Sequence, residues 1–146
     1  MAAEPRVRFS ALWRRLDAAG DGADVFERLA AAYAEEGRAY HTIEHVNDCL
    51  ARLDEAPAFS GSSNVVEAAI WFHDVVYDTH RTDNERLSAE WAGRALTAAG
   101  VSGPTISRVQ GLVLATDHAG EPTDDAGRLL SDIDLSVLGS EPVAFD

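Results

Sequence analysis

Residues 68–78 read Ala68-Ala69-Ile70-Trp71-Phe72-His73-Asp74-Val75-Val76-Tyr77-Asp78. The pattern predicts a helix that is apolar on every side except at His73 and Asp74, and such a helix belongs in the middle of a domain. A buried carboxylate is costly unless a cation or strong hydrogen bonds compensate it. A divalent ion held by His73 and Asp74 would meet that need, and so would a structural His-Asp pair bonded to neighbouring helices.

Helical patterns also precede and follow this stretch. The further predicted helices run from about Val7 to Ala19, Ala23 to Glu36, Thr42 to Leu53, Thr82 to Ala99, Thr105 to Thr116, and Asp124 or Asp125 to Leu138. Asn64 with Glu67, and Thr82 with Glu85, resemble capping boxes that start the central helix and the next one. No segment shows the period-two alternation of a strand. The sequence therefore predicts an all-α bundle of about seven helices in a single domain, residues 1–146.

Composition limits the classes of function. The chain has 146 residues, 46% of them hydrophobic, which suits one folded domain with a core. Its net charge is -13, which argues against nucleic-acid polymers and anionic membranes as partners. Cys49 is the only cysteine, so no internal disulfide can form and the cytoplasm is the expected compartment. We find no signal-peptide hydrophobic region at the start and no apolar run long enough to cross a bilayer.

Two histidines, His41 and His45, stand four residues apart, so on a helix they would share a face. With Glu44 between them they match H-x-x-E-H, the inverted zinc-protease motif. A protease of that kind also needs a third ligand and a cleft for an extended peptide. A small helical chain offers little room for such a cleft, so this is the less favoured hypothesis.

Acidic residues interrupt the apolar pattern of the last predicted helix at Asp132 and Asp134. Because residues two apart point to opposite sides of a helix, only one of the two side chains is expected to face the core. An acid in that run is either an exposed residue or a buried ligand. The local pattern alone favours the exposed interpretation.

Taken together, His45, the His73-Asp74 pair and Asp134 resemble the pattern of the HD-domain superfamily of metal-dependent phosphohydrolases. That pattern is a His, an adjacent His-Asp pair on a central helix and a distant Asp on a later helix. The closer resemblance is to a branch of small proteins described as predicted metal-dependent HD phosphohydrolases. Four stretches carry it in the expected order: Tyr40 to Val46, Trp71 to Asp78, Asp83 to Ala89, and Leu130 to Gly139.

The resemblance implies an HD-type helical domain with four metal ligands, His45, His73, Asp74 and Asp134. Asp134 is preferred to Asp132 because the family ligand is followed by an apolar residue, here Leu135. His45 is preferred to His41 because the first His of the family lies within a helix. His41 would then contact substrate, support a ligand, or be a loop histidine.

The same resemblance implies hydrolysis of a small phosphate ester or a nucleotide by a metal-activated water. The residues expected to take part in catalysis are Asp74, His41 and Arg38. Those expected to bind substrate are Arg38, His41, Arg81, Asn84 and His118. His118 has a structural explanation as well, because a cation at the end of a helix interacts favourably with its dipole.

Mixed His and carboxylate ligands suit manganese, iron, cobalt or zinc better than a magnesium-only site. Some proteins of HD fold instead bind a diiron centre, and others bind ligands without turnover. A diiron centre needs two more His ligands between the His-Asp pair and the last Asp, where the chain offers only His80 and His118. A single ion is therefore favoured. The substrate and the oligomeric state, a homodimer included, do not follow from the sequence.

The chain departs from the family pattern after the last Asp. Relatives with this pattern usually continue for more helix, whereas Gly139 and Pro142 end it here within a few residues. We therefore expect the domain to lack a C-terminal helix of the family, which would leave one side of the site less closed.

Overall fold

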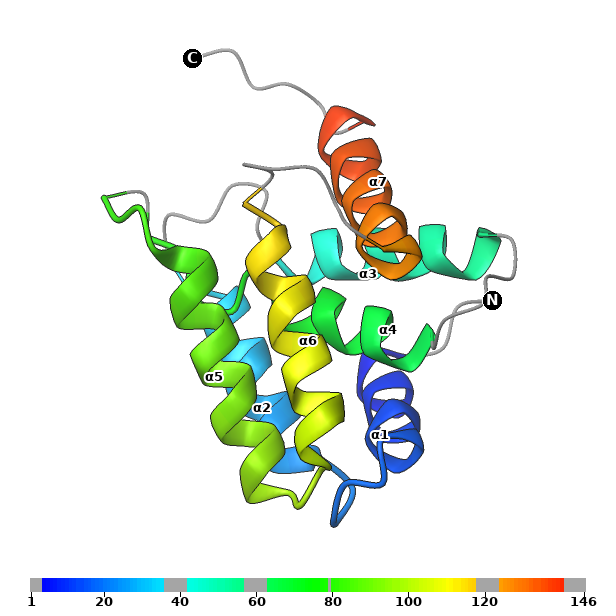
Figure 1. The fold of residues 1–146 in the computed structure, drawn as a ribbon, viewed down its shortest axis with the longest axis vertical. Helices are drawn as coiled ribbons and strands as arrows, with labels where there is room; N and C mark the ends of the chain where they lie inside the picture. The colour runs from blue at the N-terminus through cyan, green and yellow to red at the C-terminus, as the bar shows by residue number, and fades with distance from the viewer. Residues whose placement is uncertain (1–3, 36–41, 57–62, 79, 118–123, 141–146) are drawn as a thin grey trace.

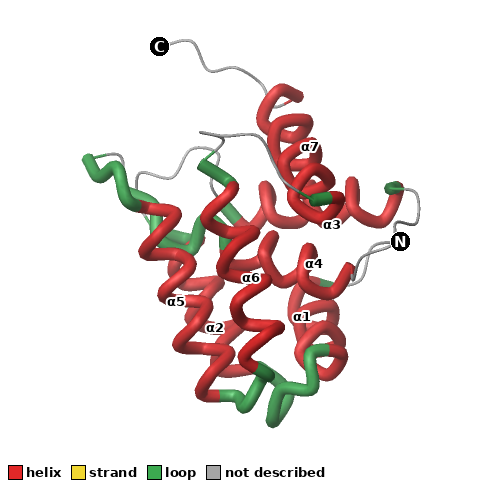
Figure 2. The backbone as a smooth tube through the Cα atoms, in the orientation of Figure 1, coloured by secondary structure: helices red, strands yellow, loops and turns green. Residues whose placement is uncertain are grey.

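The computed structural model describes residues 4–35, 42–56, 63–78, 80–117 and 124–140. In these ranges the chain forms seven α-helices and no strand (Figure 1, Figure 2). The helices are α1 (Pro5–Arg15), α2 (Ala23–Tyr33), α3 (Ile43–Glu55), α4 (Ser63–Phe72), α5 (Asn84–Ala98), α6 (Gly103–Ala115) and α7 (Asp125–Ser140). The predicted all-α class, the number of helices and the single small domain are confirmed.

Helix α4 is the central element. Every residue from Val65 to Phe72 is buried, and α4 contacts α1, α3, α5, α6 and α7. Figure 1 shows it crossing the middle of the molecule, with α1 on one side and α3 and α7 on the other. Apolar surface contributes about 25 cal/mol per Å² when it is removed from water. A helix that is apolar all round therefore gains most at the centre, as the sequence predicts.

An aromatic cluster joins α4 to the first two helices. The ring of Phe9 on α1 stacks on Trp13 at 5.3 Å and meets the edge of Trp71 at 5.2 Å between ring centroids. Phe26 of α2 lies 5.9 Å from the same Phe9 ring. Offset and edge-to-face pairs of this kind add stability beyond the area they bury. The cluster fixes α1 and α2 against the half of α4 that leads into the His-Asp pair.

One charged residue lies within the buried part of α4. Glu67 is 3% exposed, and its carboxylate accepts hydrogen bonds from Arg8 at 3.3 Å and from Arg15 at 3.1 Å. The structure differs here from the predicted capping box of Asn64 and Glu67. Helix α4 begins at Ser63, and both side chains accept hydrogen bonds from Arg15. A buried carboxylate needs a positive charge beside it, and the two arginines supply this charge whereas a backbone amide does not.

The second predicted capping box is also wrong. The N-cap of α5 is Asp83, one residue after Thr82. The carboxylate of Asp83 forms ion pairs with Arg81 at 2.8 Å and with Arg86 at 2.7 Å. Asp83 thus ties the loop before α5 to the first turn of the helix. None of the helices in the described ranges is long and apolar enough to cross a membrane.

A close approach of two helices fixes α6 beside α5. Gly93 of α5 is buried, and a Cβ atom at this position would lie 2.3 Å from Nε2 of Gln110 on α6. The amide group of Gln110 donates a hydrogen bond of 3.0 Å to the carbonyl of Ala89, one turn earlier on α5. The missing side chain of Gly93 therefore leaves the space through which Gln110 reaches the α5 backbone.

Candidate metal centre

The His-Asp pair lies in a turn directly after α4, not inside the helix. Helix α4 ends at Phe72, and the amide of Val75 donates to the carbonyl of Phe72 at 3.2 Å. The sequence predicts a helix that continues beyond His73 and Asp74, so this part of the prediction is wrong. The turn brings two adjacent side chains together, and Nε2 of His73 lies 3.2 Å from Oδ2 of Asp74.

Side chains from distant helices stabilise this turn. The buried Tyr33 at the end of α2 donates its hydroxyl to the carbonyl of Trp71 at 2.8 Å and accepts from the amide of Asp74 at 3.3 Å. Ser88 of α5 accepts from the amide of Val76 at 3.0 Å and donates to its carbonyl at 3.2 Å. Buried backbone groups must be paired. Because two hydroxyl groups meet this need, the helix can end where it does.

Helices α3 and α7 supply the other two side chains. His45 is buried in the first turn of α3, and Asp134 is buried in the middle of α7. The exposed Asp132 lies on the other face of α7. Asp134 is therefore the one of the two that faces the core, as expected for a helix, and its role as a ligand stays a prediction.

Each of the two histidine nitrogens lies close to oxygens of both Asp74 and Asp134. Nε2 of His45 lies 3.1 Å from Oδ1 of Asp134 and 4.0 Å from Oδ2 of Asp74. Nε2 of His73 lies 3.4 Å from the same Asp134 oxygen. Ligand atoms that surround one ion at about 2.0–2.2 Å stand about 3 Å apart as neighbours and about 4 Å apart on opposite sides. The observed separations fall in that range.

The orientation of His73 is fixed by its other ring nitrogen. Nδ1 of His73 donates to the carbonyl of Ile70 at 2.7 Å, which places a proton on Nδ1. A hydrogen bond of this kind sets the tautomer in metal sites, because it leaves the Nε2 lone pair for the ion. Nε2 of His73 is buried and has no hydrogen-bond partner within the described part of the chain. Instead it faces two carboxylate oxygens.

The electrostatics of the cluster favour a cation. Burial lowers the pKa of His73, but the nearby carboxylates of Asp74 and Asp134 more than compensate and raise this pKa well above its usual value. A neutral His73 would turn its Nε2 lone pair toward the buried carboxylate of Asp134 and the partly exposed carboxylate of Asp74, which is unfavourable unless a positive charge, that of a proton or of a metal ion, lies between them. A divalent ion would supply this charge, and nitrogen and carboxylate donors suit a transition ion. The residues therefore fit a metal.

Sequence reasoning did not assign Cys49 to the site. Its buried Sγ atom lies 3.7 Å from Nε2 of His45. His45, Cys49 and Asp134 form one group whose potential ligand atoms all lie within 4.8 Å of one another, and His45, His73 and Asp74 form another. The spacing of four residues from His45 was the available signal, because it puts both side chains on one face of a helix.

The supporting hydroxyl groups were missed as well. No local pattern links Tyr33 or Ser88 to the His-Asp pair. Tyr33 is 38 residues from Trp71, and Ser88 is 12 residues from Val76. Such contacts depend on how α2 and α5 pack against the end of α4.

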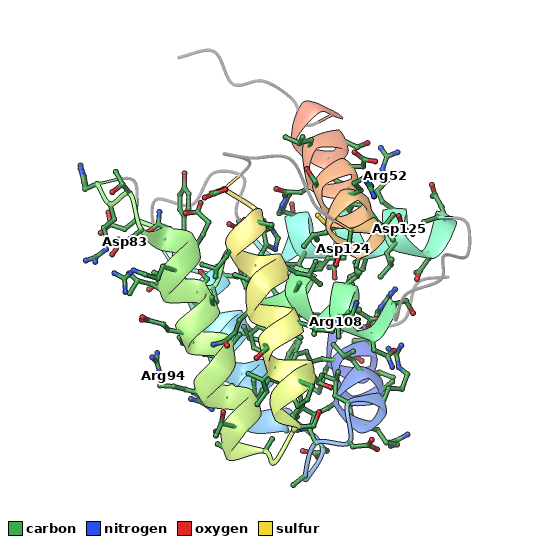
Figure 3. All side chains as sticks on the ribbon, in the orientation of Figure 1. Arg52, Asp83, Arg94, Arg108, Asp124 and Asp125 are labelled. Carbon is green, nitrogen blue, oxygen red and sulfur yellow. The ribbon has the colours of Figure 1, made fainter. Side chains whose placement is uncertain are left out.

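Of the five predicted substrate-binding residues, the structure describes Arg81 and Asn84. Arg81 is paired with Asp83, and Figure 3 shows Asp83 at the edge of the molecule beside the start of α5, across α6 from α7. Asn84 accepts from the amide of Asp78 at 3.2 Å and donates to its carbonyl at 2.9 Å, so it holds the loop after the turn. Arg38, His41 and His118 lie outside the described residues.

The structure describes some of the residues on which the protease and diiron alternatives depend. Glu44, the acid of the H-x-x-E-H motif, is exposed, whereas His45 is buried. His80, one of the two histidines considered for a diiron centre, is exposed in the loop before α5. The comparisons with known proteins return no match to a family model, a curated protein or a solved structure.

Proposed function

We propose that the chain is a metal-dependent hydrolase of a small phosphate ester or nucleotide, with His45, His73, Asp74 and Asp134 as the metal ligands. The resemblance to the HD superfamily supplies the reaction class. The observation that carries the proposal is the position of Nε2 of His73, a buried nitrogen without a hydrogen-bond partner in the described part of the chain, against oxygens of Asp74 and Asp134, both of which also lie near Nε2 of His45.

Asp74 differs from the other three proposed ligands in its exposure. Its side chain is 18% exposed, against 0% for His45, 2% for His73 and 6% for Asp134. Solvent and substrate would therefore reach the centre past Asp74. This exposure supports a role in which Asp74 orients the attacking water and accepts its hydrogen bond.

The other three ligands would hold the ion from the buried side. His45 and Asp134 belong to well-packed helices, and His73 is oriented by its hydrogen bond to Ile70. A divalent ion in such a site lowers the pKa of a bound water and polarises a phosphoryl oxygen. Arg38 and His41 remain the proposed partners of the phosphoryl charge, because both come just before the helix that carries His45.

The charge of the protein narrows the substrate class. At a net charge of -13, long polyanions are repelled, whereas a small phosphorylated molecule needs only local compensation. We therefore propose a small phosphorylated substrate in place of a nucleic-acid polymer. Glu44 is exposed whereas the adjacent His45 is buried, so Glu44 lies on a different face of α3 from the proposed centre, which disfavours the zinc-protease alternative.

The test combines metal analysis with a substrate panel. Purified protein is loaded with Mn²⁺, its metal content is measured, and phosphate release is followed across nucleotides and common phosphoesters. We expect one ion per chain and metal-dependent release from at least one substrate. Asp134→Asn should lose both the ion and the activity, whereas Asp132→Asn, the same change on the exposed face of the same helix, should retain both.

Other outcomes separate the alternatives. A bound ion without turnover across the panel would indicate a non-catalytic binding module. Cleavage of casein that is lost in Glu44→Gln would indicate the protease. Two ions per chain would indicate a dinuclear centre.

A further inference from the structure

Cys49 places a thiol at the edge of the proposed metal centre. It lies one turn after His45 on α3 and is fully buried, with Sγ 3.7 Å from Nε2 of His45. Asp134 completes a group of three buried side chains whose potential ligand atoms lie within 4.8 Å of one another. In a purely structural role a buried cysteine packs as a small apolar side chain. Here the sulfur instead faces an imidazole nitrogen and a carboxylate.

We propose that His45, Cys49 and Asp134 form a second ligand set, which binds a thiophilic ion such as Zn²⁺ or Cd²⁺ through the thiolate of Cys49. This set shares His45 and Asp134 with the four-residue set of the proposed function, and in this respect it rests on that proposal. On binding, the Cys49 thiol loses its proton to solvent and the sulfur–metal bond forms.

The two separations that involve Nε2 of His45 suit a tetrahedral ion. Nitrogen and oxygen ligands at about 2.0–2.1 Å and sulfur at about 2.3 Å stand roughly 3.3–3.6 Å apart around such an ion. The 3.7 Å between Cys49 Sγ and His45 Nε2 and the 3.1 Å between His45 Nε2 and Asp134 Oδ1 lie close to these values. A sign of a cation beside Asp134 that does not involve Cys49 is the buried Nε2 of His73, which lacks a hydrogen-bond partner in the described ranges and lies 3.4 Å from Oδ1 of Asp134.

The two ligand sets exclude each other. Nε2 of His45 has one lone pair and can bind one ion at a time. A thiophilic ion drawn toward Cys49 would therefore remove His45 from the four-residue set. Sulfur ligands select zinc and related soft ions, whereas carboxylates suit manganese and magnesium. The ion present would then decide whether the centre is arranged for hydrolysis or blocked.

The test is a titration with Cd²⁺ that is monitored by ultraviolet absorption. Thiolate–cadmium bonds absorb ultraviolet light, and Cys49 is the only cysteine of the chain. We expect a charge-transfer band that saturates at one Cd²⁺ per chain in the wild type. Cys49→Ser and Cys49→Ala should lack the band and bind Cd²⁺ more than about tenfold more weakly. Added Mn²⁺ should diminish the wild-type band in proportion to its own binding.

Further variants test whether the whole set is used. Asp134→Asn should weaken the band, and Asp132→Asn should leave it unchanged. Circular dichroism checks that each variant is folded. If the Cys49 variants do not fold, the titration of the wild-type protein still decides the question. Absence of the band in folded wild type, an equal band in Asp134→Asn, or simultaneous binding of Mn²⁺ and Cd²⁺ would overturn the second set.

The experiments distinguish a failure of the second ligand set from a failure of the proposed hydrolase function. Mn²⁺ binding with phosphate release but no thiolate band would remove the second set and leave the proposed function. A thiolate band that requires Asp134, with no turnover on any phosphoester, would retain the second set and remove the hydrolase.

Discussion

Nε2 of His45 lies 3.1 Å from Oδ1 of Asp134, although the two residues are 89 positions apart in the chain. His45 is in the first turn of α3 and Asp134 in the middle of α7, so the contact exists only when the last helix is packed against the third (Figure 1). An ion held by both residues would bind the packed state and not the unfolded chain. Metal binding and the docking of α7 are therefore linked.

This linkage predicts a metal-dependent stability. With free Mn²⁺ at one hundred times its dissociation constant, the free energy of unfolding should rise by about 2.7 kcal/mol. Asp134→Asn should abolish the increase because it removes a shared ligand, and Asp132→Asn should preserve it. Urea denaturation with and without Mn²⁺ measures both. An equal increase in Asp134→Asn would show that the ion binds elsewhere.

The turn after α4 should depend on the hydroxyl of Tyr33. Tyr33→Phe leaves the carbonyl of Trp71 and the amide of Asp74 without this partner. Burying unpaired groups costs about 1–3 kcal/mol, so we expect a loss of that size in urea denaturation, with weaker Mn²⁺ binding in calorimetry.

Ser88→Ala provides the parallel test on the other side of the turn. It removes both hydrogen bonds to Val76, and a similar loss of stability is expected. If either change lowers stability by less than about 0.5 kcal/mol, the range typical of surface substitutions, that hydroxyl does not hold the turn.

Replacement by alanine should change the stability of the protein differently at two helical glycines. Gly111 of α6 is exposed, and a Cβ there meets nothing within 4 Å, so Gly111→Ala should stabilise the protein by about 0.5–1 kcal/mol. Gly93→Ala must displace Gln110, which then loses its hydrogen bond to Ala89.

That lost bond is worth about 0.5–1.5 kcal/mol, so it offsets the gain in helix propensity. Gly93→Ala should therefore be less stable than Gly111→Ala by about 1 kcal/mol in urea denaturation. In the Gln110→Ala background the difference should shrink. Equal stability of the two single variants would contradict the packing of Gln110 against α5.

The loop before α5 carries a carboxyl group with a shifted pKa. The hydrogen bond from Arg81 is the main cause that lowers the pKa of Asp83 from 3.8 to about 2; desolvation opposes it, and the charge of Arg81 and a hydrogen bond from Arg86 add to it. A carboxyl group whose pKa is lower in the folded state than in the unfolded state stabilises the folded state at pH values above its unfolded pKa. This contribution is therefore present above pH 3.8 and lost as the pH falls toward about 2.

Nuclear magnetic resonance titration of the Asp83 carboxyl tests this shift. Its midpoint should lie near 2 in the wild type and move toward 3.8 in Arg81→Gln. Arg94→Gln removes the same charge from the exposed side of the other half of α5 (Figure 3) and should leave the midpoint unchanged. A midpoint that Arg81→Gln does not move would show that Arg81 is available to a phosphate in solution.

The periodic and compositional features of the sequence predicted the fold class well. Helical spacing placed the seven helices of the described ranges. The apolar stretch of residues 68–78 was expected at the centre, where its part up to Phe72 lies in α4. These features are local, because a helix forms from residues three and four apart and is buried in proportion to its apolar surface. The His45, His73, Asp74 and Asp134 set came from a family resemblance, and its role as a metal site stays a prediction.

The sequence by itself thus determined the helices and which of them is buried. The tertiary structure alone decided where α4 stops, which partner Glu67 takes, and that Cys49 faces the same centre as His45 and Asp134. The physical reason is that helix ends and buried polar groups need hydrogen-bond partners, and here these come from other helices. Tyr33, Ser88 and Arg15 meet their partners only after the helices have packed.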